Sequence, residues 1–174
     1  MQNAVGQVSG LIWLNNQIMQ NNRTTSANYI HQIAHLERVL FDDAWTVLSI
    51  ENWLSFDGHI AIVVRSPDGT ITGYALMSQV FDSADVLRIG VAPDCQRQGI
   101  AQRLLQAIVA RLKRQAVERV LLEVREDNAA ARALYDKLGF KQIHVRKNYY
   151  KNADGSRCHA LILQLDLVEN HGWA

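Results

Sequence analysis

The middle of the chain carries the pattern that most constrains its fold. Residues 84–93, "ADVLRIGVAP", and residues 118–126, "ERVLLEVRE", are β-rich, and residues 99–116 between them have the apolar spacing of a helix. The inward positions of that helix are expected to be Ile100, Leu104, Leu105, Ile108 and Leu112. A strand, a helix and a second strand in this order indicate a parallel crossover. The pattern therefore predicts an α+β (mixed α/β) fold, with a central mixed twisted sheet, a parallel strand–helix–strand core and flanking helices.

The segments before this unit predict a smaller set of elements. Residues 17–23, "QIMQNNR", are predicted to form a first strand, and residues 24–41 and 45–56 are predicted to be helices. Residues 59–80 contain two β-rich runs separated by Ser-Pro-Asp-Gly, which predicts a hairpin.

The segments after it predict a helix and a pair of strands. Asn128 is expected to cap a short helix that ends at Gly139, because Asn accepts amide bonds at a helix start and Gly adopts the left-handed terminating conformation. Residues 140–151 and 158–167 are predicted to form an antiparallel pair.

The length favours one domain. A chain of 174 residues can bury about two thirds of its unfolded surface in a single core. We expect that domain to span residues 16–168. Residues 1–15 are uncharged and lack clear periodicity, which predicts a disordered N-terminal extension, and residues 169–174 are expected to be a C-terminal tail.

Composition narrows the compartment and the partners. The formal net charge is only +1, which argues against nucleic-acid binding. The apolar runs are too short to cross a bilayer, and no Lys or Arg precedes Arg23, so neither a membrane span nor an export signal is expected. Cys95 and Cys158 stand in no metal-ligand spacing, which indicates a reduced protein with neither a disulfide nor a metal site. The sequence predicts a cytoplasmic protein.

The turn between the first strand and the helix is unusual. It reads "VAPDCQRQGIAQRLL", residues 91–105, and has no acid after Asp94. A helix start usually carries a polar cap and acids in its first turn. Backbone N–H groups freed of bulk at Gly99 and Ala101 could instead hold a pyrophosphate, with Arg97 adding charge. On spacing alone, an ordinary strand-to-helix turn is an equal alternative.

Two residues further along could move protons. Glu123 interrupts the apolar run "VLLEV", where partial burial would raise the pKa of a carboxyl toward the range of a general base. A glutamate on the solvent face of the strand is the alternative. Tyr135 borders the buried face of its helix, where a phenol could donate a proton or could simply be a core residue. Neither residue alone decides the function.

The three motifs together resemble one family. "QRQGIA", then "LEVREDNAAARALYDKLGF", then "VRKNYY" resembles the GCN5-related N-acetyltransferases, and within them the RimI-type enzymes that acetylate the N-terminal alanine of a small-subunit ribosomal protein. The likeness extends from about residue 17 and is strongest over residues 86–150. The second block, which aligns Asn128, Tyr135 and Gly139, is more specific than the loop.

The resemblance implies a chemistry and a set of roles. It implies direct acetyl transfer from acetyl-CoA, without a metal, to a free α-amine of a ribosomal protein. Glu123 falls on the family's proton acceptor and Tyr135 on its proton donor, while Tyr149 and Tyr150 would wall the peptide entrance. The implied cofactor-binding residues are Ile89, Gly90, Val91, Arg97, Gln98, Gly99, Ile100, Ala101, Gln102 and Asn128.

Two departures and two alternatives remain at this stage. Ala101 replaces the second loop glycine of the family, and Ala44 stands before Trp45 where the family has proline. The acceptor could instead be another amine, such as lysine, a polyamine or an aminoglycoside. A module that binds acyl-CoA without turnover is the alternative from a different class.

Overall fold

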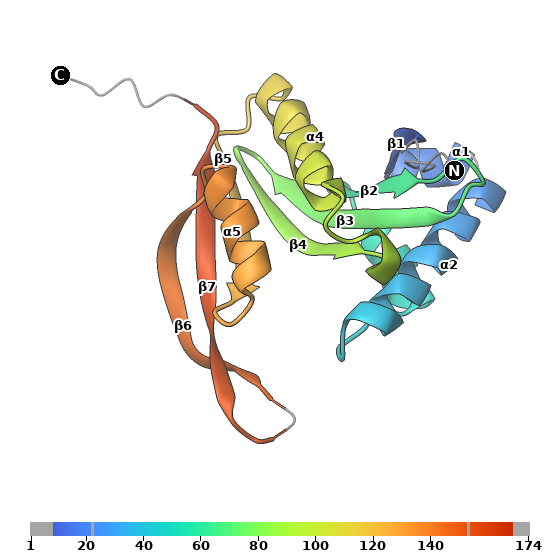
Figure 1. Cartoon of the computed structure of the whole chain (residues 1–174). Helices are drawn as coiled ribbons and strands as arrows, with labels where there is room; N and C mark the ends of the chain where they lie inside the picture. The colour runs from blue at the N-terminus through green and yellow to red at the C-terminus, as the bar shows by residue number, and fades with distance from the viewer. Residues whose placement is uncertain (1–8, 22, 153, 169–174) are drawn as a thin grey trace, which may run out of the picture. The chain divides into compact units, whose positions relative to one another are not determined.

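The computed structural model describes residues 9–21, 23–152 and 154–168, in which seven strands follow the sheet order β1-β2-β3-β4-β5-β7-β6 (Figure 1). The strands are β1 (Ser9–Leu14), β2 (His59–Arg65), β3 (Ile71–Val80), β4 (Ser83–Val91), β5 (Arg119–Arg125), β6 (Lys141–Lys151) and β7 (Arg157–Asp166). The helices are α1 (Asn16–Asn21), α2 (Arg23–Leu40), α3 (Val47–Leu54), α4 (Ile100–Arg114) and α5 (Ala129–Lys137), with a 3-10 turn η1 (Pro93–Cys95). The predicted mixed α+β class is confirmed.

The predicted parallel crossover is also confirmed. Residues 83–86 of β4 pair in parallel with residues 119–122 of β5, and α4 connects the two strands. The five apolar residues predicted to face inward along α4 are all buried: Ile100, Leu104, Leu105, Ile108 and Leu112. Their spacing alone decided the helix face, because residues three and four apart share one side of a helix.

The described chain divides into two compact units, one within residues 1–78 and 88–106 and the other within residues 79–87 and 107–174. In the first unit, β2 pairs antiparallel with both β1 and β3. Gly73 of β3 faces α4, because a Cβ there would lie 2.6 Å from Ile100 Cγ2. The next residue, Tyr74, faces α2 and donates its hydroxyl to Glu37. The two helices therefore cover opposite faces of β3.

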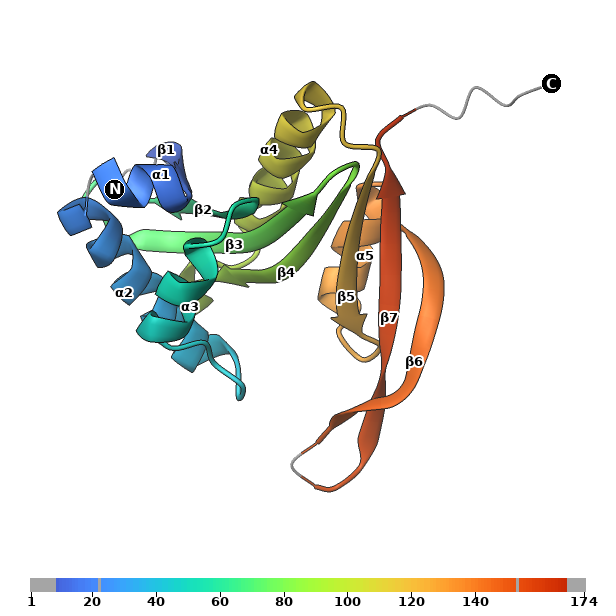
Figure 2. The same cartoon turned by 180° about the vertical axis from the view of Figure 1, so that it is seen from behind.

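In the second unit, β7 pairs antiparallel with β5 on one side and with β6 on the other (Figure 2). The cap predicted for α5 is present, since Asn128 Oδ1 accepts the Ala131 N–H at 3.1 Å. Gly139 follows the helix with φ +91°, as expected for its terminator. The ring of Tyr135 meets Phe140 edge-on at 5.7 Å and anchors α5 to the chain that enters β6.

The N-terminal predictions are wrong in two places. Residues 9–14, expected to be part of a disordered extension, form β1, and Leu14 is fully buried in the core. Residues 16–21, expected to lie largely in a strand, form α1, because Asn15 Oδ1 accepts the Ile18 N–H at 3.0 Å and starts a helix. The rest of the predicted extension and the predicted tail lie outside the described residues. The single domain over residues 16–168 stays a prediction, and β1 shows that the folded chain also includes residues before 16.

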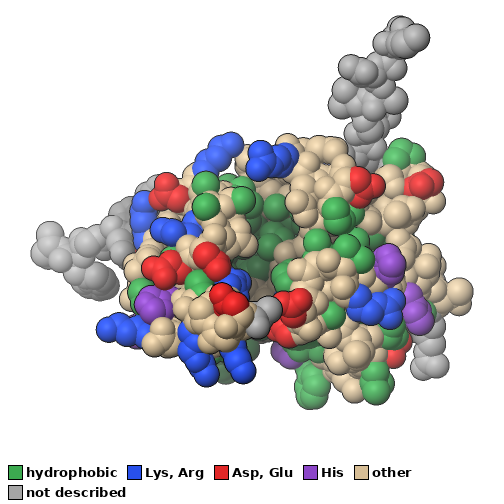
Figure 3. Space-filling model, turned by 60° about the horizontal axis from the view of Figure 1, so that its bottom comes forward, with side chains coloured by type: hydrophobic (Ala, Val, Ile, Leu, Met, Phe, Trp, Pro, Cys, Tyr) green, Lys and Arg blue, Asp and Glu red, His purple; other side chains and the backbone are tan. Residues whose placement is uncertain are grey.

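The described helices and side chains have few features of other classes of protein. No helix in the described ranges is long and apolar enough to cross a membrane. Within the same residues, no group of three or more His, Cys, Asp and Glu side chains could hold a metal ion. On the face drawn in Figure 3, basic and acidic side chains are interspersed. That face offers no extended basic field for a nucleic acid.

Candidate active site

The loop before α4 has the backbone of an anion-binding turn. Arg97 has φ +60° and Gly99 has φ +78°, so left-handed residues alternate with Gln98 between them. Alternation of this kind turns successive N–H groups toward one side of the loop and makes a concavity that binds anions. A Cβ on Gly99 would meet no atom within 4 Å, so the space next to this glycine is open.

The helix start adds further donors to this loop. The Arg103 N–H bonds the Gly99 carbonyl at 3.0 Å and begins the helical ladder. The amides of Gly99, Ile100 and Ala101 come before that first turn is closed, and they point out of the positive end of α4. Ala101, where the family has glycine, adds only a methyl group to this end of the helix. These groups are suited to the pyrophosphate that the family resemblance implies here.

Two glutamine side chains stabilise the loop by hydrogen bonds to main-chain carbonyls. Gln96 Nε2 donates to the Val91 carbonyl at 3.3 Å, and Gln98 Nε2 donates to the Asp94 carbonyl at 3.2 Å. Burial, and then the charge of Asp94, raises the pKa of the Cys95 thiol, which favours its neutral form. A neutral thiol in the loop agrees with a packing role and not with a nucleophile.

The strand before the loop is shaped by close packing. A Cβ on Gly90 would lie 2.5 Å from Tyr74 Cε1, so only glycine fits against this ring. The parallel ladder between β4 and β5 covers residues 83–86. Ile89, Gly90 and Val91 lie beyond it, which leaves main-chain groups on that edge for an extended ligand such as a pantetheine arm.

Glu123 of β5, in the second unit, is not isolated among apolar side chains as the sequence suggested. Its Oε1 accepts the Tyr150 hydroxyl at 2.8 Å, and its Oε2 pairs with Arg146 Nη1 at 3.0 Å. The Glu123 side chain is 25% exposed and that of Arg146 is 51% exposed. Arg146 and Tyr150 both donate to this carboxylate, so Glu123 is a hydrogen-bond acceptor that is partly open to solvent.

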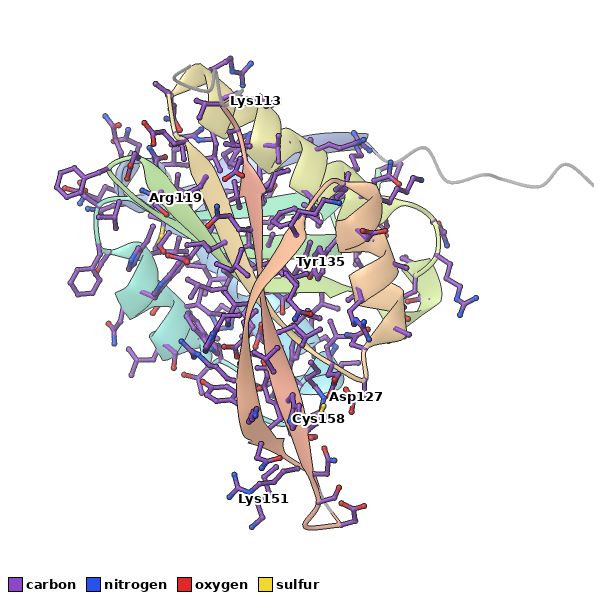
Figure 4. The ribbon with its side chains drawn as sticks, turned by 90° about the vertical axis from the view of Figure 1, so that its left-hand side faces the viewer. Lys113, Arg119, Asp127, Tyr135, Lys151 and Cys158 are labelled. Atoms are coloured by element: carbon purple, nitrogen blue, oxygen red, sulfur yellow. The ribbon has the colours of Figure 1, made fainter. Side chains whose placement is uncertain are left out.

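Tyr135 projects from α5 toward the strands of the same unit (Figure 4). The residue is only 5% exposed, and burial raises the pKa of its phenol to about 12. The described residues offer its hydroxyl no hydrogen-bond partner. A buried phenol with this pKa is protonated at neutral pH and keeps its proton available to a ligand.

The two tyrosines near the end of β6 have different surroundings. Tyr150 is held by Glu123, and burial, followed by that hydrogen bond, raises the pKa of its phenol. Tyr149 is half exposed and meets the Tyr150 ring edge-on at 5.1 Å. The Arg146 guanidinium lies 5.3 Å from the centre of the Tyr149 ring. Tyr149 and Tyr150 therefore form a small aromatic surface next to the Glu123 carboxylate.

The structure distributes the predicted residues over both units. The loop residues 97–102 and the strand residues 89–91 belong to the first unit, and Glu123, Asn128, Tyr135 and both tyrosines of β6 belong to the second. Arg146 was given no role from the sequence, although it lies within the quoted "VRKNYY". Its pairing with Glu123 crosses three strands, since Glu123 is in register with Ile162 and Ile162 with His144. The alignment of these three strands cannot be predicted from a local sequence pattern.

Comparison with known proteins agrees with this class of site. The chain matches the family described as Acetyltransferase (GNAT) family over residues 28–140. It belongs to this family, and it is an acyltransferase of a group that uses acetyl-CoA.

Its relatives narrow the group further. The chain is 41% identical over 97 residues to the [Ribosomal protein bS18]-alanine N-acetyltransferase of Haemophilus ducreyi, covering 56% of this chain and 67% of that protein. It is 41% identical over 100 residues to the protein of the same name from Escherichia coli (strain K12), covering 58% and 67%. The crystal structure of the ribosomal-protein-S18-alanine N-acetyltransferase from Escherichia coli superposes with a TM-score of 0.76 at 28% identity, over 95% of this chain and 99% of that one.

The open space at Gly99 gives a test of the loop. We predict that Gly99→Val raises the Kd of acetyl-CoA at least tenfold, about 1.4 kcal/mol, because the new side chain fills the path to the loop amides. The substitution also strains a residue at φ +78°, so Gly69→Val is the matched control: Gly69 has φ +93° and equally open surroundings in the β2–β3 turn. Isothermal calorimetry on both variants measures the effect. Equal affinity in the two folded variants would remove the loop from the binding site.

Proposed function

We propose that the protein transfers the acetyl group of acetyl-CoA directly to the N-terminal alanine of a ribosomal protein of the bS18 kind, in the cytoplasm. One observation carries the proposal more than any other. A hydrogen-bonded carboxylate on β5, Glu123, and a buried protonated phenol on α5, Tyr135, occur in the same compact unit. The printed names of the two 41% identical relatives support the choice of acceptor.

In this proposal, Glu123 takes the proton that the acceptor must lose. A free α-amine has a pKa near 8, so most acceptor molecules are protonated and unreactive at neutral pH. The Glu123 carboxylate accepts hydrogen bonds from Arg146 and Tyr150 and its side chain is still 25% exposed, so it can receive that proton directly or through one water. The neutral amine then attacks the thioester carbonyl, and the carbon–sulfur bond breaks.

Tyr135 acts on the sulfur that leaves. Thiols ionise near pH ~8.5, well below the phenol, so complete proton transfer to the thiolate is uphill. Tyr135 therefore stabilises the developing negative charge first as a hydrogen-bond donor, and its proton follows as the thiol is released. Solvent then returns a proton to the phenolate, while Glu123 releases to solvent the proton that it took from the amine. The described residues offer its hydroxyl no competing acceptor, so it needs no rearrangement to make this bond.

The residues of the first unit hold the donor in this proposal. The amides of Arg97, Gly99 and Ala101 bind the pyrophosphate, and residues 89–91 pair with the pantetheine arm. Asn128 was predicted to contact the donor near its reactive end. Its Oδ1 is committed to the cap of α5, which leaves its side-chain NH₂ for that contact.

A peptide panel tests the acceptor. We expect the purified protein and acetyl-CoA to acetylate a peptide with the N-terminal sequence of bS18, and to acetylate it faster than the same peptide with a blocked N-terminus and an internal lysine. Mass spectrometry of the products locates the acetyl group. Preference for the lysine, for a polyamine or for an aminoglycoside would assign a different acceptor, and binding without any product would indicate a module without turnover.

The role of Glu123 predicts a change in the pH profile. We expect Glu123→Gln to lower kcat by about 10²-fold and to flatten the acidic limb between pH 6 and 9, because the variant cannot accept a proton. Acetyl-CoA affinity should be unchanged. Glu118→Gln, an exposed carboxylate just before β5, is the matched control and should leave the profile intact. A near-normal kcat in a folded Glu123→Gln variant would exclude this residue as the base.

The raised pKa of Tyr135 predicts the opposite pattern. With a pKa of about 12, its phenol is protonated across pH 6–9. Tyr135→Phe should therefore lower kcat by at least tenfold, and by the same factor at every pH in that range, without moving either limb. Tyr29→Phe, another buried tyrosine, controls for the loss of a hydroxyl from the core. A basic limb that disappears in Tyr135→Phe would mean that the phenol titrates in this range and would contradict its burial.

A further inference from the structure

The edge strand β6 contains a bulge just before the two tyrosines. Arg146 lies opposite Ala160 of β7, and Tyr150 lies opposite Cys158, so four steps along β6 match two steps along β7. The two extra residues are taken up around Asn148, which has φ +54°. Asparagine tolerates this left-handed conformation better than most residues, but something must hold it there.

Two side chains of β7 hold the bulge. The Asn148 N–H donates to His159 Nδ1 at 3.0 Å, and Arg157 Nη1 donates to the Asn148 carbonyl at 3.0 Å. Both main-chain groups of the left-handed residue are therefore satisfied by one neighbouring strand. The His159 carbonyl also accepts the Glu126 N–H at 3.0 Å, which ties the same residue to the turn after β5. His159 Nδ1 is therefore an acceptor in this contact, which leaves Nε2 as the other ring nitrogen for a second partner.

The bulge decides where Tyr150 lies. Without it, the strand would place Asn148 opposite Cys158, and Tyr150 would be two residues further along. Each residue of a strand advances about 3.3 Å, so the bulge brings Tyr150 about 7 Å back toward Arg146. The hydrogen bond between Tyr150 and Glu123 is 2.8 Å long, so a shift of that size would break it.

We infer that His159 is a positioning residue for the acceptor side of the site: its Nδ1 holds Asn148 in the bulge and thereby places Tyr150 against Glu123. This inference rests on the proposed function for its effect on turnover. The contact itself and the placement of Tyr150 do not depend on that function. Arg157 supports the same bulge through the carbonyl, whereas His159 is the side chain that accepts its N–H.

Two substitutions separate the role of the acceptor atom from the role of packing. His159→Leu removes the acceptor and keeps an apolar side chain of similar size. His159→Asn keeps an acceptor, because Oδ1 of asparagine can take the place of Nδ1. We expect His159→Leu to raise the KM for the alanine peptide at least tenfold with little change in acetyl-CoA affinity, and His159→Asn to remain within about threefold of the wild type. His31→Leu, an exposed histidine on α2, is the control.

Nuclear magnetic resonance tests the contact without any turnover. In the wild type, a ¹⁵N–¹⁵N coupling across the hydrogen bond should connect the Asn148 amide to His159 Nδ1. The Tyr150 ¹³Cζ shift should move in His159→Leu toward its value in Glu123→Gln, and should stay near the wild-type value in His159→Asn. If His159→Leu does not fold, His159→Gln replaces it, because its longer side chain places the acceptor beyond Asn148.

The outcomes are distinct. Absence of the coupling, or a Tyr150 shift that is unchanged in His159→Leu, overturns the inference. An altered shift with an unchanged peptide KM also overturns it. If the wild type acetylates no N-terminus while the coupling and the Tyr150 shift behave as expected, the proposed function fails and the placement of Tyr150 by His159 stands. Equal losses in His159→Leu and His159→Asn would assign His159 to packing alone.

Discussion

The buried carboxylate of Glu37 is the constraint on which the first unit depends. The residue is fully buried, and an ionised carboxylate removed from water costs several kcal/mol unless its oxygens are satisfied. Oε1 accepts the Tyr74 hydroxyl, and Oε2 accepts the Trp45 N–H at 3.0 Å and lies 3.8 Å from Arg88 Nε. Burial, and then the bond to Glu37, raises the pKa of the Tyr74 phenol and keeps it a donor. Three separate segments must therefore be in place before this unit is stable.

Two of those segments, the ones that contain Tyr74 and Arg88, border the predicted donor site. Arg88 directly precedes Ile89, and it also binds Asp43 at 2.7 Å, which lowers the pKa of that carboxyl. The Tyr74 ring packs against Gly90 so closely that no side chain fits there. The loop between α2 and α3 has Ala44 where the family has proline, and here it is held through Trp45 by Glu37. The Glu37 carboxylate thus fixes the main chain at Trp45, one residue after the position where a proline would have restricted it.

The parts of the fold that follow from local pattern could be predicted from the sequence. The buried face of α4 depends on the spacing of apolar residues, and the ends of α5 depend on the cap at Asn128 and on Gly139. Each of these signals lies within a few residues of the feature that it determines. β1 was missed because its uncharged, glycine-containing segment becomes a strand only by pairing with β2. The pairing of Glu123 with Arg146 could not be predicted either, because it depends on the register of three strands.

The hydrogen-bond partners of Tyr74, Tyr135 and Tyr150 distinguish their proposed roles more clearly than their solvent exposure does. The hydroxyls of Tyr74 and Tyr150 donate to the carboxylates of Glu37 and Glu123, respectively. Neither hydroxyl proton is therefore free to bond a ligand. Tyr135 is as buried as a core residue, yet the described part of the chain gives its hydroxyl no acceptor. The ring is buried, but the hydroxyl oxygen still reaches solvent, so it can donate to a ligand without first breaking a bond within the described part of the protein. In the proposed function, the sulfur that gains negative charge during the reaction is the acceptor, and a hydrogen bond that strengthens only as that charge develops stabilises the transition state more than the bound substrate.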